Sequence, residues 1–312
     1  ARKRRCIASR RNFAPWLTWL VVLELLGCSM FALLFRALPG LPDRGFALAK
    51  MLALLLVAYT AWLLGSLHLL AFGTLSTWLC AGILITAGAL VGWRSRAALR
   101  TFLRERRAAL LSAEGLFLVA YLGFVLIRAL NPDLWHPARG GEKPMDLAFL
   151  TAVVKSPYFP PYDPWFAGGF INYYYFGFVI VGALVQLTGI APAIAYNLAV
   201  PTLFALTALG AWGAIYNLLA LRTAERNQLL SRPGYGAALG SRIERRAITT
   251  GLLAAALIVV IGPLTQALWL LPGSAKTDPT LPAECQALSS YASQQQCRDR
   301  DEWAFWDATR LV

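Results

Sequence analysis

NPDLWHPARGGEKPMDLAFLTAVVKSPYFPPYDPWFAGGFINYYYFG, residues 131–177, is the long polar passage between the apolar segments of this chain. It contains four acids, three bases and one of the two histidines, and it ends in a run of aromatic residues. From Phe166 to Ala220 there is no Lys, Arg, Asp, Glu or His. An acidic loop rich in Pro and Gly beside an uncharged aromatic segment indicates a reaction site at a membrane surface.

The composition of the chain predicts an all-α, polytopic transmembrane protein. Of the 312 residues, 58% are hydrophobic and 14% are charged, which is too apolar for a soluble globular domain. Apolar stretches of the ~20 residues needed to cross ~30 Å of hydrocarbon recur along it. The net charge of +13 does not indicate nucleic-acid binding, because no separate basic domain carries it.

Basic residues gather in three blocks, at 2–11, 94–107 and 222–246, each with six of the 29 Lys and Arg. Each block flanks an apolar segment, where Lys and Arg hold loops in the cytoplasm and attract anionic lipid head groups. The second block is typical of a basic amphipathic helix on the cytoplasmic surface. Anionic lipids are therefore expected partners, whereas protein partners are unknown.

The topology follows from placing the second and third blocks in the cytoplasm. Residues 131–190 then form a large extracytoplasmic loop, and the apolar segment 171–187 is a juxtamembrane or partly inserted helix. Domains are expected at 1–107 (N-terminal helices), 108–271 (core with the outer loop) and 272–312 (extracytoplasmic tail). The predicted spans are 16–35, 51–72, 73–93, 108–127, 192–221 and 247–271.

Two features of the termini follow from this arrangement. Three spans separate the first and second basic blocks, so both are cytoplasmic only if one span is re-entrant, and the orientation of the N-terminus stays open. The chain begins without Met and stops in an amphipathic passage, which suggests a fragment of a longer chain.

In the tail, Cys285 and Cys297 could close a disulfide in an oxidising compartment.

Ionisable residues inside the spans are functional candidates by default. They are Glu24, His68 and Glu114. Hydrogen bonding to a neighbouring helix explains Glu24 equally well, and it explains His68 better than metal ligation does. His68 and His136 fall in different compartments, which excludes a histidine metal site. A hard divalent cation held by carboxylates stays open as a cofactor.

The acids of the outer loop have two interpretations. Glu142 and Asp146 lie at the start of a helix predicted over residues 144–156, where acids are stabilised by the helix dipole. They either cap this helix, or one of them is a catalytic base facing a surface cavity. Asp163 stands between prolines, which is typical of a turn, and it is a third catalytic candidate. The tyrosines at 173–175 form either an interfacial belt or a platform for a sugar ring or a polyprenyl chain.

This passage, with its GGEKPMD and NYYYFG motifs, resembles the bacterial and archaeal "YYY" membrane proteins, an uncharacterised family named for its tyrosine run. The likeness is specific over residues 131–206. It extends to the LPDRG turn at 41–45 and to WDATR at 306–310. It implies a multi-pass protein of a bacterial or archaeal cell membrane.

The layout also resembles the GT-C glycosyltransferases, which use polyprenyl-phosphate sugar donors. Those enzymes carry an acid early in the first large outer loop, then a proline pair leading into a short apolar helix. Glu142 or Asp146 matches the acid, and Pro160-Pro161 matches the pair. The likeness implies inverting sugar transfer from a polyprenyl-phosphate lipid on the extracytoplasmic face, with Asp146 or Glu142 taking the proton of the acceptor hydroxyl.

Cations near the leaving phosphate would stabilise its developing charge. The expected substrate-binding residues are Arg128, His136, Arg139, Lys143, Asn172, Tyr173, Tyr174 and Tyr175. The alternative is a transporter or lipid-binding scaffold without covalent chemistry, with Glu24, Glu114 and His68 as its embedded polar sites. A structural subunit of a larger membrane complex is a third hypothesis.

Overall fold

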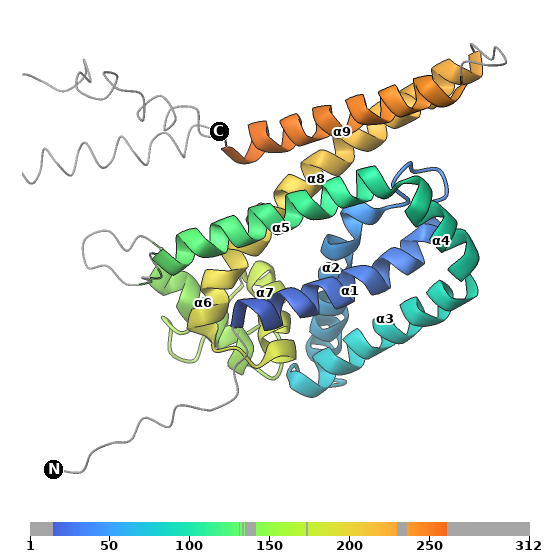
Figure 1. Cartoon of the computed structure of the whole chain (residues 1–312). Helices are drawn as coiled ribbons and strands as arrows, with labels where there is room; N and C mark the ends of the chain where they lie inside the picture. Colours follow the sequence, from blue (N-terminus) through green and yellow to red (C-terminus); the bar gives the residue numbers. More distant parts are fainter. Residues whose placement is uncertain are drawn as a thin grey trace, which may run out of the picture. The chain divides into compact units, whose positions relative to one another are not determined.

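The computed structural model describes residues 15–130, 132, 134, 142–172, 174–229 and 236–260 (Figure 1). These residues are helical, apart from connecting turns and an isolated bridge between Tyr162 and Phe170. They fall in one compact unit up to Ala255; of a second unit, 256–312, only the end of one helix is described. The predicted all-α architecture is confirmed.

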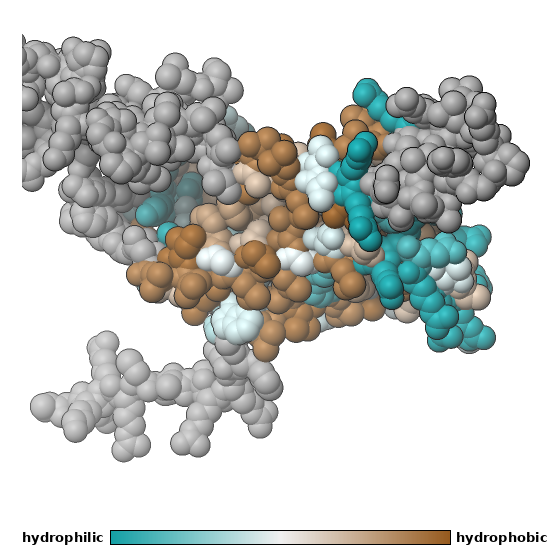
Figure 2. All heavy atoms as spheres, turned by 45° about the horizontal axis from the view of Figure 1, so that its top comes forward, coloured by the Kyte–Doolittle hydropathy of each residue, from teal (hydrophilic) through white to brown (hydrophobic). Residues whose placement is uncertain are grey.

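Five described helices are long and apolar enough to cross a membrane. They are α1 (Pro15–Ala37), α2 (Phe46–Ser66), α3 (Thr74–Arg94), α5 (Arg107–Leu130) and the Pro192–Arg222 part of α8 (Pro192–Leu229). A last helix, α9 (Gly236–Val260), begins within the third basic block and covers the start of the predicted sixth span. Apolar side chains cover much of the face in Figure 2, and hydrophilic ones gather at one end of it.

The predicted bounds of the second span were wrong. α2 begins five residues earlier than expected, at Phe46, and ends at Ser66 instead of residue 72. Lys50 belongs to the helix although it interrupts the apolar run, and Leu67–Phe72 is apolar but forms a turn. His68 therefore lies outside the span, exposed in this turn, where it stacks on Tyr158 with ring centroids 4.6 Å apart.

The second basic block forms the end of α3 and the short helix α4 (Arg96–Glu105). Leu99 and Phe102 of α4 pack against a cluster of α1 that includes Phe31 and Phe35. The ring centroids of Phe35 and Phe102 are 5.4 Å apart. The apolar face of α4 thus covers the end of α1, and its arginines stay outside this contact. Figure 1 shows α4 connecting α3 and α5 at the opposite end of the helices from α6 and α7.

The outer loop contains two helices, α6 (Lys143–Lys155) and α7 (Tyr175–Thr188). They pack side by side against the ends of α2 and α3, where Phe159 and Val179 share a buried cluster with Ala58 and Phe72. The N–H of Phe72 donates to the carbonyl of Pro157 at 2.6 Å. With 14 residues, α7 is ~21 Å long and cannot cross ~30 Å of hydrocarbon. The arrangement agrees with a partly inserted helix.

These contacts also fix the direction of the first helix. The end of α1 packs on α4, so its beginning lies on the side of α6 and α7. Each of α1, α2 and α3 is long and apolar enough for a full crossing between the start of α1 and α4. His68 lies on the side of α6 and α7, where it stacks on Tyr158, and His136, from which it was expected to be separated, lies outside the described residues.

Close packing and buried polar contacts hold the helices together. Gly88 and Gly92 of α3 face Ser29 and Ala32 of α1, and small residues four apart let two membrane helices approach closely. Trp19 of α1, fully buried, donates from Nε1 to Oγ1 of Thr202 of α8 at 2.9 Å. Within α8, Pro201 stands one turn after Asn197. A proline has no N–H to donate to the carbonyl four residues before it.

Candidate functional site

Asp146, at the start of α6, is held in place by a side chain from α8. A proline in the first turn starts α6, and Asp146 lies in this turn. Its carboxylate accepts a hydrogen bond from the Tyr196 hydroxyl, with Oη and Oδ2 3.0 Å apart. No side-chain hydrogen bond caps α6 at Glu142. The geometry therefore directs the Asp146 carboxylate toward α8, which the capping interpretation does not require.

The surroundings of Asp146 raise the pKa of its carboxyl above the ordinary value. Burial is the largest cause, because a desolvated carboxylate is less stable than the neutral acid. The hydrogen bond from Tyr196 lowers the pKa, and the negative charge of Glu142 raises it. A carboxylate with a raised pKa binds a proton more readily than an exposed one, which suits a general base.

Arg128 reaches the same region from the end of α5. Its guanidinium donates to Oδ1 of Asn197 through Nε, at 2.9 Å, and through Nη2. The Asn197 amide donates in turn to the carbonyls of Pro132, at 3.2 Å, and Ala193, at 3.1 Å. Two adjacent residues of α8, Tyr196 and Asn197, thus hold an acid from α6 and a base from α5.

The other predicted acids and bases of residues 131–190 that the structure describes make none of these contacts. Glu142 is exposed just before α6, and Lys143 is the first residue of that helix. The carboxylate of Asp163 accepts the backbone N–H of Trp165 at 2.8 Å, a local bond that Asp forms in turns. This contact supports a structural role for Asp163. His136 and Arg139 lie outside the described residues.

The tyrosine run divides at the start of α7. Tyr175 accepts a hydrogen bond from Trp62 Nε1 of α2 at 3.1 Å, and its ring stacks on Phe159. Tyr174 is 77% exposed and adopts a left-handed backbone conformation with φ of 55°. Asn172 is exposed as well, and Tyr173 lies outside the described residues. Tyr175 therefore packs against α2, whereas Asn172 and Tyr174 are on the accessible surface.

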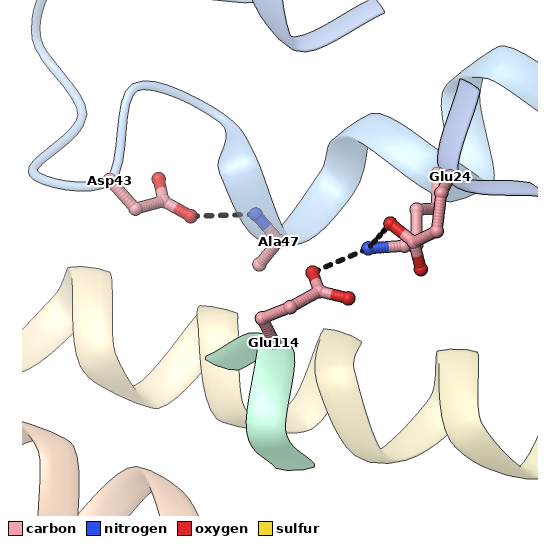
Figure 3. A network of polar contacts seen from close by, with 5 residues as sticks. Glu24, Asp43, Ala47 and Glu114 are labelled. Atoms are coloured by element: carbon pink, nitrogen blue, oxygen red, sulfur yellow. Dashed lines mark hydrogen bonds and ion pairs between the residues drawn. The ribbon is translucent and has the colours of Figure 1, made fainter. Parts of the chain in front are cut away.

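A second polar cluster lies inside the membrane-spanning helices. The ammonium of Lys50, on α2, is 3.0 Å from Oε2 of Glu24 on α1 and 2.6 Å from Oε2 of Glu114 on α5. Figure 3 shows the two glutamates facing one another from different helices. The Lys50 nitrogen also lies 4.5 Å from the ring centroid of Phe117. Glu24 and Glu114 were predicted candidates, but Lys50 was missed.

Asp43 fixes the start of α2 beside this cluster (Figure 3). It is almost fully buried, and its carboxylate accepts the backbone N–H groups of Gly45, at 2.9 Å, and Ala47, at 3.0 Å. Its own N–H donates to Asn217 of α8 at 3.1 Å. The LPDRG turn therefore caps α2 and ties it to α8, which sets the position of Lys50, four residues after the start of α2.

Within the described residues, no three His, Cys, Asp or Glu side chains gather as metal ligands would. The sequence matches the family described as "Uncharacterized membrane protein (DUF2298)" over residues 56–312. The chain belongs to this family. No curated protein and no solved structure matches it.

The DUF2298 match covers the site around Asp146 but only part of the embedded cluster. Arg128, Asp146 and Tyr196 lie inside the matched residues, as does Glu114. Glu24 and Lys50 precede residue 56, where the match begins. In this DUF2298 chain, the residues around Asp146 thus lie wholly within the matched region, whereas the embedded cluster lies only partly within it.

Tyr196 and Asn197 were missed because the sequence shows them only as polar residues in an apolar span. They do carry a signal, because they lie close to the outer end of an otherwise uncharged helix that follows the acidic loop. Amides and phenols at such positions hydrogen-bond across helices. The signal could have flagged the residues, but not their partners Asp146 and Arg128.

Proposed function

We propose that this chain is a membrane-embedded glycosyltransferase that transfers a sugar from a polyprenyl-phosphate donor on the extracytoplasmic face of a bacterial or archaeal cell membrane. One observation carries the proposal. The half-buried Asp146 carboxyl, with its raised pKa, is hydrogen-bonded to Tyr196 where α5, α6 and α8 meet the outer surface. A carboxylate so placed is a general base at the depth where a lipid phosphate meets water.

The reaction needs one base and no redox change. Asp146 takes the proton of the acceptor hydroxyl as the acceptor oxygen bonds to the anomeric carbon of the donor. The bond from this carbon to the phosphate oxygen breaks with inversion, and the electron pair leaves with the polyprenyl phosphate. Tyr196 holds the carboxylate in place during this step and stabilises its charged form.

The leaving phosphate gains negative charge, which a fixed cation stabilises in the transition state. Arg128 supplies the cation. Its guanidinium is held by Asn197, which is adjacent in sequence to Tyr196, the residue that holds Asp146. Arg139 and Lys143 are proposed to assist it. The exposed Asn172 and Tyr174, with Tyr173 and His136, would contact the sugar. The exposed basic face of α4 would bind anionic lipid on the other side.

The test is Asp146→Asn in the full chain, reconstituted in lipid nanodiscs. Radiolabelled polyprenyl-phosphate hexoses and pentoses serve as donors, and the release of polyprenyl phosphate is measured. Transfer should fall by ~10²–10⁴, as is typical when acid–base catalysis is lost. Asp163→Asn is the matched control, because its carboxylate accepts a local backbone hydrogen bond. Full activity in Asp146→Asn would overturn the proposal.

A second candidate, transport without covalent chemistry, is supported by the embedded cluster of Glu24, Lys50 and Glu114. Charged side chains inside membrane helices often mark ion pathways. His68 does not add to this cluster, because it lies in the exposed turn after α2. The two hypotheses separate in one experiment. The transferase depends on Asp146, whereas a transporter would lose flux with Glu24→Gln or Glu114→Gln and keep it with Asp146→Asn.

A further inference from the structure

The cluster formed by Glu24, Lys50 and Glu114 is unbalanced in charge. Two carboxylates face one ammonium. If all three were ionised, the cluster would carry a net charge of −1. Glu24 lies more than two helical turns from either end of α1, so the charge would lie within the membrane span. An uncompensated charge in such surroundings is usually removed by a change of protonation.

The cluster's hydrogen bonding points to the same result. Lys50 contacts one oxygen of each glutamate, Oε2 in both cases. The second oxygen of Glu24, Oε1, is buried and has no donor partner. Both contacts are made to the same Lys50 nitrogen, so the two carboxylates lie beside one another. Two carboxylates that share one site repel each other unless one of them carries a proton.

Among the described residues, no further charged side chain forms an ion pair with this cluster. The sequence contains no Lys, Arg, His, Asp or Glu over residues 74–93 of α3, 175–188 of α7 and 192–221 of α8. The Cys28 thiol, one turn after Glu24 on α1, is neutral when protonated. Phe117 and Phe46 present their rings to the Lys50 ammonium, which favours its charged form.

We propose that Glu24 and Glu114 share one exchangeable proton, so that together with Lys50 they form a proton-binding site within the membrane. The proton comes from water and returns to water, and no bond other than O–H forms or breaks. With the proton bound, the cluster is neutral and joins α1, α2 and α5. Its release leaves a net charge of −1 between these helices. This inference is independent of the proposed sugar transfer.

The test is infrared spectroscopy of the full chain in lipid nanodiscs at neutral pH. A protonated carboxyl absorbs at a carbonyl stretching frequency that carboxylates lack. The wild-type chain should show one such band, and ¹³C labelling of the glutamate carboxyls should shift it, which separates Glu from Asp146. Glu24→Gln and Glu114→Gln each leave one acid opposite one base. Both variants should therefore fold and lose the band.

Glu105→Gln is the control, because Glu105 is exposed on α4. It should leave the band unchanged. A wild-type chain without the band would overturn the proposal, as would a band that survives in either single variant that folds. Replacing sodium by choline in the buffer tests whether sodium competes with the proton for this site. The band should not depend on this exchange, and a band present only without sodium would show that the site binds sodium in place of the proton.

Discussion

Gly88→Ala should destabilise the chain by separating α1 from α3. A Cβ at this position would lie 2.3 Å from the carbonyl oxygen of Ser29 and 2.8 Å from its carbonyl carbon. These are backbone atoms of a helix, so the contact is relieved only if the helices move apart by roughly 1 Å. A gap of that size forfeits up to about half of the dispersion energy of each contact across it. Overpacking of this kind costs about 1–3 kcal/mol.

Gly82→Ala is the matched control on the same helix, because a Cβ there would meet nothing within 4 Å. Both substitutions gain the same helix propensity, about 1 kcal/mol, so their difference isolates the helix contact. The assay is unfolding of the full chain in mixed micelles by increasing SDS, followed by circular dichroism. Gly88→Ala should unfold at lower SDS than Gly82→Ala. Equal midpoints would refute the close contact between α1 and α3.

Three further predictions concern the two clusters and the cap of α2. In the pH profile of transfer, the acid limb follows the pKa of Asp146, because the base acts deprotonated. The hydrogen bond from Tyr196 lowers the pKa of Asp146, so Tyr196→Phe should raise this pKa and move the limb to higher pH. The negative charge of Glu142 raises the same pKa, so Glu142→Gln should move the limb to lower pH. Shifts of the same sign would contradict this electrostatic account. Asp43→Ala should cost about 1–3 kcal/mol in the SDS assay, because it leaves two buried backbone N–H groups without acceptors, and an unchanged midpoint would count against the cap. Lys50→Met should cost about 3–5 kcal/mol, and amides at both partner acids should recover most of it. No recovery would show that Lys50 stabilises the helices through packing alone.

The helices could be predicted from the sequence because hydropathy reports directly on length and burial. The first, third and fourth spans and the uncharged part of α8 differ from the predicted ranges by a few residues. α2 differs more, because hydropathy cannot distinguish an apolar turn, Leu67–Phe72, from a helix end. Hydropathy also argues against placing Lys50 in a membrane span, because the residues that compensate its charge are far away in the sequence. The predicted helix at the start of the outer loop matches α6 closely, because proline marks its beginning.

For each interacting pair in the candidate sites, only one of the two residues could be predicted from the sequence. Asp146 was recognised from its local motif, but its partner Tyr196 is 50 residues away and on another helix. Glu24 and Glu114 were recognised as embedded acids, yet the question of their partner was left open. A rule that every embedded acid needs a base would have pointed to Lys50. Periodicity assigns a residue to a face of its helix, and only the packing of helices decides which faces meet.

Pro201 has a consequence for how the outer site can move. Because it offers no N–H to the carbonyl of Asn197, the first two turns of α8 lack one of the bonds that would tie them to the rest of the helix. Tyr196 and Asn197 both belong to these turns, so a bend at Pro201 would act on both of their contacts. A small rotation at Pro201 would release Asp146 and Arg128 together. The acid and the cation would thus be set in place, or freed, in a single step.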